Sequence, residues 1–203
     1  TENTRRETYM ERTLEQKLEQ AVWAAHVLFE RGTVKGNTGN ISIRHGDKIY
    51  ISASGTCFGT LKLSDFAVMD LEGNMLEKKA SKEWPLHLSV YRHKPDVNGV
   101  IHTHSTYAVL WGPQCVPGSV DVMPDFTPYL RMKLGTVSCV EYGMPGSEEL
   151  FAAFEREVDR ADGWLLFRHG TVVPGKTILD AFYAQEELEE TARILWELQK
   201  RNE

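Results

Sequence analysis

The sequence predicts a protein of the α/β class in which helices and strands are mixed along the chain. Apolar residues recur at helical spacing near both ends, while short runs typical of β-strands occupy much of the centre. No internal repeat, low-complexity tract or linker divides the sequence. With 203 residues, 41% of them hydrophobic, the chain is long enough for a sizeable core, and we expect residues 1–203 to form one domain.

The first helix is expected over residues 14–29. Thr13 is a typical N-cap with Gln16 at the capping-box position, and Gly32 is a natural stop. The preceding residues 1–12 are polar and charged, so we expect a flexible N-terminal segment there. Glycine-punctuated strands are then predicted at residues 41–44, 48–52 and 66–70.

The second half of the chain continues the alternation. A helix over residues 84–93 should end before Pro95, and an apolar strand then runs from residue 98 into His102-Thr103-His104. The remaining expected elements are a short helix at 105–112, a loop rich in proline and glycine at 113–128, a strand near 136–142, a helix from Ser147 to about 161, a strand at 164–168 and a final helix from Thr177 to about Lys200.

Charge and composition exclude several classes of function. The formal net charge is −6 and no basic run is present, which argues against nucleic acid as the main partner. No apolar stretch approaches the ~18 residues that a membrane span needs, and no secretory signal is visible. Three widely spaced cysteines without a Cys-x-x-Cys pattern are typical of reduced thiols, so we expect a cytoplasmic protein.

His102-Thr103-His104 is the most informative motif. Side chains on a strand alternate between its faces, so these two histidines point the same way, roughly 6.5–7 Å apart. Two imidazoles at that separation can converge on one metal ion with bonds of about 2 Å. By itself, the pattern would better fit two surface histidines at the end of an edge strand.

Two further residues favour the metal. Glu83 lies 19 residues before His102, and His169 follows the strand-like run 164–167. Together with His104 they complete a ligand set for zinc, so we predict a catalytic divalent-metal site. Glu83 could instead be a structural residue favoured by a helix dipole, or it could act as a general base in the metal pocket. The other histidines lack a matching context and are interpreted as structural or exposed: His26, His45, His87 and His93.

Small hydrogen-bonding residues surround these candidates. The segment 36–42 joins a helix to a strand, and it is either a loop that needs glycine for a positive φ or an anion-binding nest. Beside a metal site, such segments indicate a small anionic substrate that carries phosphate. The candidate substrate-binding residues are Gly39, Asn40, Ser54, Gly55, Ser81 and Lys82.

Residues 170–177 match the pattern of a phosphate-binding P-loop, which would indicate a nucleotide-hydrolysing enzyme. Three observations argue against it. The β-branched residues at 171–173 favour an extended backbone over a phosphate-wrapping turn. Only 26 residues follow Thr177, all in one helical pattern, so no later strand can carry a second acidic motif. The first glycine of the pattern directly follows His169, which the metal site already explains.

The chain resembles the class II aldolase/adducin family over residues 14–200. The resemblance rests on five segments that occur in the family's order: Thr38-Gly39-Asn40-Ile41-Ser42, Ser54-Gly55-Thr56, Ser81-Lys82-Glu83, His102-Thr103-His104 and Arg168-His169-Gly170. Fuculose-1-phosphate aldolase and ribulose-5-phosphate 4-epimerase belong to this family. Within it, residues 55–61, Lys82-Glu83, 126–129 and 186–191 are most similar to the 3-oxo-tetronate 4-phosphate decarboxylases.

The resemblance implies a three-layer α/β/α fold with a largely antiparallel central sheet. It also implies a homotetramer with active sites at the subunit interfaces. Zn²⁺, or another divalent ion such as Mn²⁺ or Co²⁺, is expected on His102, His104 and His169, with Glu83 as a ligand or acid/base. Tyr129 is the further catalytic residue that the resemblance implies.

The implied activity is that of a zinc-dependent lyase, which breaks a C–C bond through a metal-stabilised enediolate. Lys82 stands where fuculose-phosphate aldolases have a second serine, which favours a substrate with an additional carboxylate. Decarboxylation of a phosphorylated 3-oxo sugar acid is therefore the favoured reaction. Aldol cleavage of a fuculose- or ribulose-type phosphate stays open because the same intermediate serves both reactions. Decarboxylation of an aromatic hydroxy acid also stays open, whereas the presence of all four metal ligands argues against a non-catalytic adducin-like domain.

Overall fold

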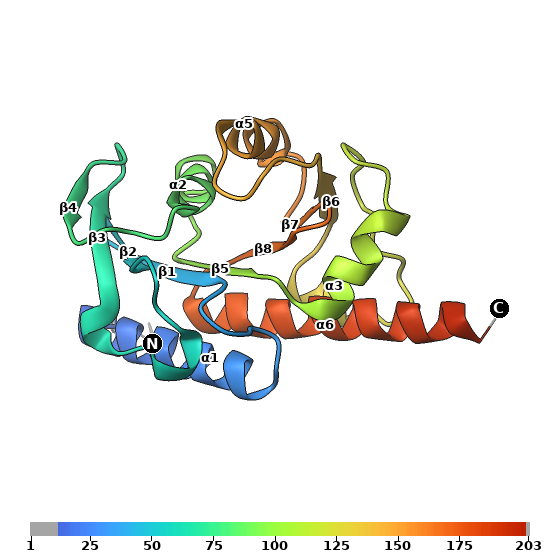
Figure 1. The fold of residues 1–203 in the computed structure, drawn as a ribbon, viewed down its shortest axis with the longest axis horizontal. Coiled ribbons are helices and arrows are strands. Elements are labelled where there is room, and N and C mark those ends of the chain that lie inside the picture. The colour runs from blue at the N-terminus through green and yellow to red at the C-terminus, as the bar shows by residue number, and fades with distance from the viewer. Residues whose placement is uncertain (1–11, 202–203) are drawn as a thin grey trace, which may run out of the picture.

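The computed structural model describes residues 12–201 and contains an eight-stranded sheet at its centre (Figure 1). The strand order is β4-β3-β2-β1-β5-β8-β7-β6, and every neighbouring pair is antiparallel except β6 and β7. This confirms the α/β class and the largely antiparallel sheet. The strands are β1 (Asn40–His45), β2 (Lys48–Ser52), β3 (Phe66–Asp70), β4 (Met75–Glu77), β5 (Gly99–Thr103), β6 (Val137–Val140), β7 (Gly163–Leu166) and β8 (Gly170–Gly175).

Helices cover both faces of the sheet, which confirms the three-layer arrangement. In Figure 1, α1 and α6 lie along one side of the sheet, and α2 and α5 lie on the other. The short helices α3 and α4 pack against α6. The helices are α1 (Leu14–Glu30), α2 (Trp84–His93), α3 (Thr106–Trp111), α4 (Tyr129–Lys133), α5 (Glu148–Glu157) and α6 (Ile178–Lys200), with single 3₁₀ turns η1 (Phe58–Thr60), η2 (Leu63–Asp65) and η3 (Gly112–Gln114).

The predicted helix starts are confirmed because they depend on local hydrogen bonds. Thr13 and Gln16 form the expected capping box at α1, and the Ser147 hydroxyl accepts a hydrogen bond from the backbone of α5. Thr177 caps α6 in the same reciprocal way with Asp180. Each such cap contributes on the order of 1 kcal/mol to the stability of its helix.

The segment that matches the P-loop pattern is a buried strand, so the interpretation as a nucleotide hydrolase is wrong. β8 lies between β5 and β7, and Thr171 pairs with Thr103 on β5 and Leu165 on β7. An extended chain hydrogen-bonded on both sides cannot wrap a phosphate. The sequence patterns predict neither β8 itself nor β4 and α4.

Each face of the sheet has its own apolar core. Trp164 on β7 packs on Phe154 of α5 with ring centroids 5.0 Å apart, and Tyr91 of α2 lies in the same cluster. The opposite face packs against α1 and α6, where Leu28 and Phe182 are buried. Burial of each large apolar side chain contributes about 1.5–3 kcal/mol to the free energy of folding, so the two cores stabilise the sheet on both faces.

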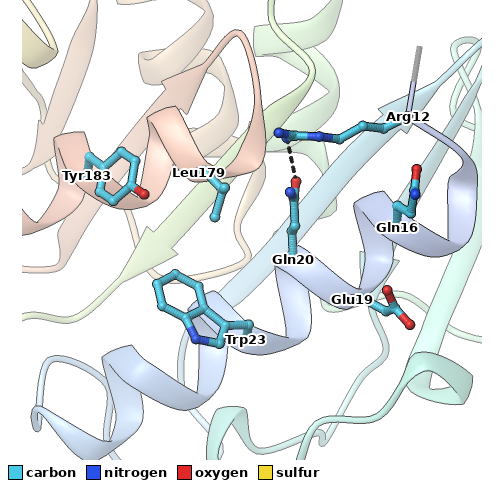
Figure 2. A pocket seen from close by; sticks show the side chains of 7 residues that line it. All are labelled: Arg12, Gln16, Glu19, Gln20, Trp23, Leu179 and Tyr183. Atoms are coloured by element: carbon cyan, nitrogen blue, oxygen red, sulfur yellow. Dashed lines mark hydrogen bonds between the residues drawn. The ribbon is translucent and has the colours of Figure 1, made fainter. Parts of the chain in front are cut away.

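A cavity of about 500 Å³ lies between α1 and the start of α6 (Figure 2). Its polar groups are side chains such as Arg12, which donates a hydrogen bond of 2.9 Å to Gln20. The cluster of metal-binding residue types described below lies elsewhere, so this cavity is not the candidate site. The residues that line it are Arg12, Gln16, Glu19, Gln20, Trp23, Leu179 and Tyr183.

Within residues 12–201, no helix has the length and apolar character needed to cross a membrane. Residues 1–11 of the predicted flexible N-terminal segment lie outside the described residues.

His93 joins α2 to α5 at their outer surface. Its Nδ1 lies 2.8 Å from an oxygen of Asp159, and its Nε2 lies 2.6 Å from an oxygen of Glu155. The hydrogen bond to Glu155 is the main cause that raises the pKa of His93 above its ordinary value of 6.5. This histidine therefore has the structural role that the sequence predicts.

We expect His93→Gln to destabilise the protein more below neutral pH than above it. Because folded His93 holds its proton more tightly than the unfolded chain does, its contribution is complete below about pH 6.5 and is lost as the pH rises through the folded-state pKa. Near pH 6 the free energy of unfolding should fall by about 0.3–1 kcal/mol in the variant, which is the scale of partly exposed ion pairs. Urea unfolding between about pH 6 and pH 9 measures it. His26→Gln is the control, since His26 contacts the Leu61 carbonyl, and an equal pH dependence in both variants would contradict the assignment.

Candidate metal centre

Four predicted ligands come together where the central strands end. His102 lies on β5 and His104 directly after it, Glu83 immediately precedes α2, and His169 lies in the tight turn between β7 and β8. Because β5 and β8 are neighbours, this turn meets the end of β5 although His169 is 65 residues beyond His104. The turn contains Arg168 with φ +56°, a left-handed conformation that is uncommon for a residue other than glycine.

The distances within the cluster suit one metal ion. Nε2 of His104 lies 3.1 Å from Nε2 of His102 and 3.0 Å from Nε2 of His169. The two carboxylate oxygens of Glu83 lie 3.0 Å from Nε2 of His102 and 3.2 Å from Nε2 of His169. Ligands on a tetrahedral zinc ion with bonds of about 2.0–2.1 Å are separated by roughly 3.3–3.4 Å, so the atoms need to move apart by only a few tenths of an ångström.

The chemistry of the cluster also fits a cation. Glu83 and His102 are buried, and Oε1 of Glu83 has no hydrogen-bond partner among the described residues. A buried acceptor without a partner costs free energy, and a divalent ion bound here would remove that cost. Burial opposes ionisation of Glu83, but the close imidazole rings of His102 and His169 outweigh the effect of burial and hold the pKa of Glu83 below its usual range, so the carboxylate is anionic.

Two of the histidines favour the neutral state that metal binding needs. Burial is the largest cause that lowers the pKa of His104 to about 3, and burial also lowers the pKa of His169. Nδ1 of His102 lies 2.7 Å from the carbonyl oxygen of Thr171, to which it donates its hydrogen. This bond leaves the Nε2 lone pair of His102 directed at the cluster, an arrangement common around protein metal sites.

A cavity of about 320 Å³ opens beside the cluster, and every predicted substrate-binding residue lines it. Glu83 and His104 also line this cavity, so the predicted substrate-binding and metal-binding groups share one space. Gly39 and Gly55 have φ angles of +76° and +81°, as the nest interpretation requires. The full lining is Asn37, Thr38, Gly39, Asn40, Ala53, Ser54, Gly55, Thr56, Ser81, Lys82, Glu83, His104 and Pro145.

Lys82 is the cation in this cavity, and within residues 12–201 no carboxylate pairs with it. Its methylene chain passes over Gly146, where an added Cβ would lie 2.9 Å from Cδ of Lys82. Gly146 and the cavity residue Pro145 belong to the loop before α5, which no sequence pattern connects with the site. No local signal could have found them, because the loop reaches Lys82 only in the folded chain.

Two residues considered in the sequence analysis do not line this cavity. Tyr129 on α4 does not line the cavity of its own chain, and its side chain is 56% exposed. His87, interpreted from sequence as structural or exposed, is fully buried and hydrogen-bonded to Asn40 at the back of the cavity.

Comparison with known proteins connects this site to a family. The sequence pattern described as "Class II Aldolase and Adducin N-terminal domain" matches residues 19–196. A protein of Haemophilus influenzae named 3-oxo-tetronate 4-phosphate decarboxylase is 35% identical over 175 residues, which are 84% of this chain and 82% of that protein. A protein of Methanocaldococcus jannaschii named L-fuculose phosphate aldolase is 36% identical over 167 residues, which are 82% of this chain and 88% of that protein.

Solved structures agree with the sequence relatives. The crystal structure of YgbL from Klebsiella pneumoniae, for which aldolase, epimerase and decarboxylase activities have been suggested, has a TM-score of 0.86 and 33% identity, covering 93% of this chain and 92% of that one. A structure named L-fuculose 1-phosphate aldolase has a TM-score of 0.82 and 28% identity, covering 94% and 90% of the two chains. The predicted class II aldolase-like fold is thereby confirmed.

We expect the purified protein to hold about one divalent metal ion per chain, and His102→Ala or His104→Ala to remove it. Each substitution deletes one of three nitrogen ligands and leaves the carboxylate of Glu83 without a full coordination set. Elemental analysis of the dialysed variants measures the metal content per chain. His26→Ala, which removes a histidine outside the cluster, should keep its metal, and full metal content in all three variants would contradict the site.

Proposed function

The chain belongs to the class II aldolase and adducin family and is a lyase of the class II aldolase type, and from this premise we propose that it is a zinc-dependent decarboxylase of a phosphorylated 3-oxo sugar acid. The similarity to proteins named 3-oxo-tetronate 4-phosphate decarboxylase supports this substrate class. Zinc is proposed because nitrogen ligands predominate in the cluster, although Mn²⁺ or Co²⁺ could occupy the same ligands.

One observation carries the choice of substrate: Lys82, whose ammonium has no carboxylate partner between residues 12 and 201, lines the same cavity as Glu83 and the small donor residues. A 3-oxo acid phosphate has two anionic groups, and the cavity offers two kinds of anion-binding group. Asn40, Ser54 and Ser81 supply hydrogen-bond donors for the phosphate, while Lys82 is available for the carboxylate that leaves as CO₂.

The side chains of the site have separate roles. His102, His104, His169 and Glu83 would hold the metal, which supplies a Lewis acid that stabilises negative charge as the C–C bond breaks. Burial of Glu83, His102 and His169 keeps bulk water away from one side of the reacting atoms. Once bound substrate has displaced it from the cluster, the Glu83 carboxylate can accept the proton of a substrate hydroxyl and deliver it to the carbon from which CO₂ has departed, and a proton from water then restores the hydroxyl.

Tyr129 remains a proposed catalytic residue on the strength of the family resemblance. Since it does not line the cavity of its own chain, we propose that it acts at the cavity of a neighbouring subunit in a homotetramer. The three free cysteines support the further proposal that the protein works in the reducing cytoplasm.

Aldol cleavage is the second candidate function. The similarity to L-fuculose phosphate aldolase, at 36% identity, supports it as strongly as the decarboxylase relatives support decarboxylation. Both reactions break a C–C bond and leave the electron pair on the carbon next to a polarised carbonyl, so the metal cluster serves either. The two substrates differ in charge at the group that is lost: it is an anionic carboxylate before decarboxylation and a neutral hydroxyl-bearing carbon before aldol cleavage. Lys82 can distinguish these two groups.

Glu83→Gln should lower turnover by roughly 100-fold or more while the protein stays folded, because the amide keeps the shape of the side chain but cannot accept a proton. Steady-state kinetics with metal content measured on the same samples separate this effect from loss of the ion. Glu157→Gln changes another buried glutamate, one that pairs with Arg160, and should leave turnover unchanged. Equal turnover of Glu83→Gln and the unaltered enzyme would reduce Glu83 to a residue that begins a helix.

Lys82→Ser should reduce kcat/KM for 3-oxo acid phosphates by about 10- to 100-fold, the loss of one charge-assisted hydrogen bond in a partly water-excluded site. Ketose phosphates, which lack the carboxylate, should be affected much less. Release of CO₂ and of aldehyde, measured for both proteins on both substrate types, tests the proposal. An equal loss on both would assign Lys82 to the phosphate, and no loss on either would remove it from the site.

A further inference from the structure

A continuous line of buried hydrogen bonds runs from α2 to the cavity. Oη of Tyr91 lies 2.7 Å from Oγ of Ser42, which lies 2.7 Å from Nδ1 of His87. Nε2 of His87 contacts Oδ1 of Asn40, and Nδ2 of Asn40 donates a hydrogen bond of 3.1 Å to Oγ of Ser81. Asn40 and Ser81 line the cavity, so this line of contacts ends at the proposed anion-binding groups.

Four of these side chains come from two packed elements, β1 and α2. Asn40 and Ser42 are two residues apart on β1 and share a face of the sheet, while His87 and Tyr91 are four apart on α2 and share a face of that helix. Tyr91, Ser42 and His87 are each no more than 1% exposed. Burial lowers the pKa of His87 to about 3, so its ring is neutral and has one nitrogen that donates and one that accepts.

The hydroxyl of Tyr91 decides the direction of every hydrogen bond in the line. Among the described residues its only hydrogen-bond partner is Ser42, so a buried O–H would be left unsatisfied unless Tyr91 donates to Ser42. Ser42 is then free to donate its own hydrogen to Nδ1 of His87. Because Nδ1 accepts, the hydrogen of the neutral ring is on Nε2, which donates to Oδ1 of Asn40.

This direction determines which end of the Asn40 carboxamide faces the cavity. With Oδ1 engaged by His87, the amide nitrogen points to Ser81 and has a second hydrogen available for a ligand. The opposite orientation would present a carbonyl lone pair to a bound anion, which is repulsive. Asn40 can therefore bind an anion only when its amide nitrogen, and not its carbonyl oxygen, faces the cavity.

We propose that Tyr91, Ser42 and His87 are positioning residues that hold the carboxamide of Asn40 with its N–H groups toward the phosphate of the substrate. The proposal rests on the proposed function, since the phosphate is that of the proposed substrate. It assigns a role in substrate affinity to buried residues of β1 and α2, without any contact between these three residues and the substrate.

The tautomer of His87 tests the proposal directly and needs no substrate. Long-range ¹H–¹⁵N spectra of the metal-loaded, ¹⁵N-labelled protein distinguish protonation at Nε2 from protonation at Nδ1, and the spectrum of His87→Gln assigns the signal. The proposal requires a neutral ring with its hydrogen on Nε2. A hydrogen on Nδ1 would reverse the line of hydrogen bonds and overturn the proposal.

A second experiment compares His87→Leu with His87→Gln. Leucine removes the donor to Asn40, whereas glutamine can donate to Asn40 through its amide nitrogen and accept from Ser42 through its carbonyl. We expect the dissociation constant of inorganic phosphate, measured by calorimetry, to rise about 10-fold in His87→Leu and to stay within about 2-fold of the unaltered protein in His87→Gln. KM should rise with the loss of phosphate affinity while kcat and metal content are retained.

Ser89→Ala is the matched control, since it removes a buried hydroxyl of the same helix that bonds to Glu155 on α5 instead of to the cavity. It should lower stability without changing phosphate affinity. Unchanged phosphate affinity in a folded His87→Leu protein would overturn the proposal. If the unaltered protein does not bind phosphate, the proposed phosphate site fails, and the tautomer of His87 still decides whether the line of hydrogen bonds runs as inferred.

Discussion

The pairing of β5 with β8 at the centre of the sheet is the constraint on which the rest of the site depends. It sets His102 opposite Val172 and brings the carbonyl oxygen of Thr171 within 2.7 Å of Nδ1 of His102. It also demands glycine at position 170, where an added Cβ would lie only 2.0 Å from the carbonyl oxygen of Thr103. The close approach of these two strands constrains the turn that carries His169 and places His169 beside His104.

The neighbouring pairing of β1 with β5 places a proposed substrate-binding residue next to the candidate metal ligands. Asn40 stands opposite His102, so the proposed anion-binding amide and a candidate metal ligand share one face of the sheet, under α2. That face is consequently polar near the strand ends and apolar farther along, where Val100 and Tyr91 pack. A cluster of buried acceptors is unfavourable for folding in isolation, and a bound cation would recover that free energy, so metal binding and stability are thermodynamically linked.

The arrangement explains how related lyases can differ in substrate while keeping one frame. The four candidate metal-binding side chains come from strand ends and a helix start, which the two cores hold in place. Lys82 comes from the loop before α2, and its side chain passes over Gly146 in another loop, so a change there need not disturb the sheet. Substrate selection through loop residues on a rigid scaffold is common in enzymes, because loops tolerate substitution better than paired strands do.

The sequence by itself determined the features that depend on neighbours along the chain. The caps at Thr13, Ser147 and Thr177 and the alternation of His102 and His104 were predictable because their geometry involves only a few adjacent residues. The family's ordered motifs added Glu83 and His169, which spacing alone could only suggest. Tertiary structure decided the rest: that a P-loop-like segment is strand β8, that His87 supports Asn40, and that Gly146 contacts Lys82. These contacts join segments far apart in sequence, and strand pairing and helix packing, which no local pattern encodes, bring them together.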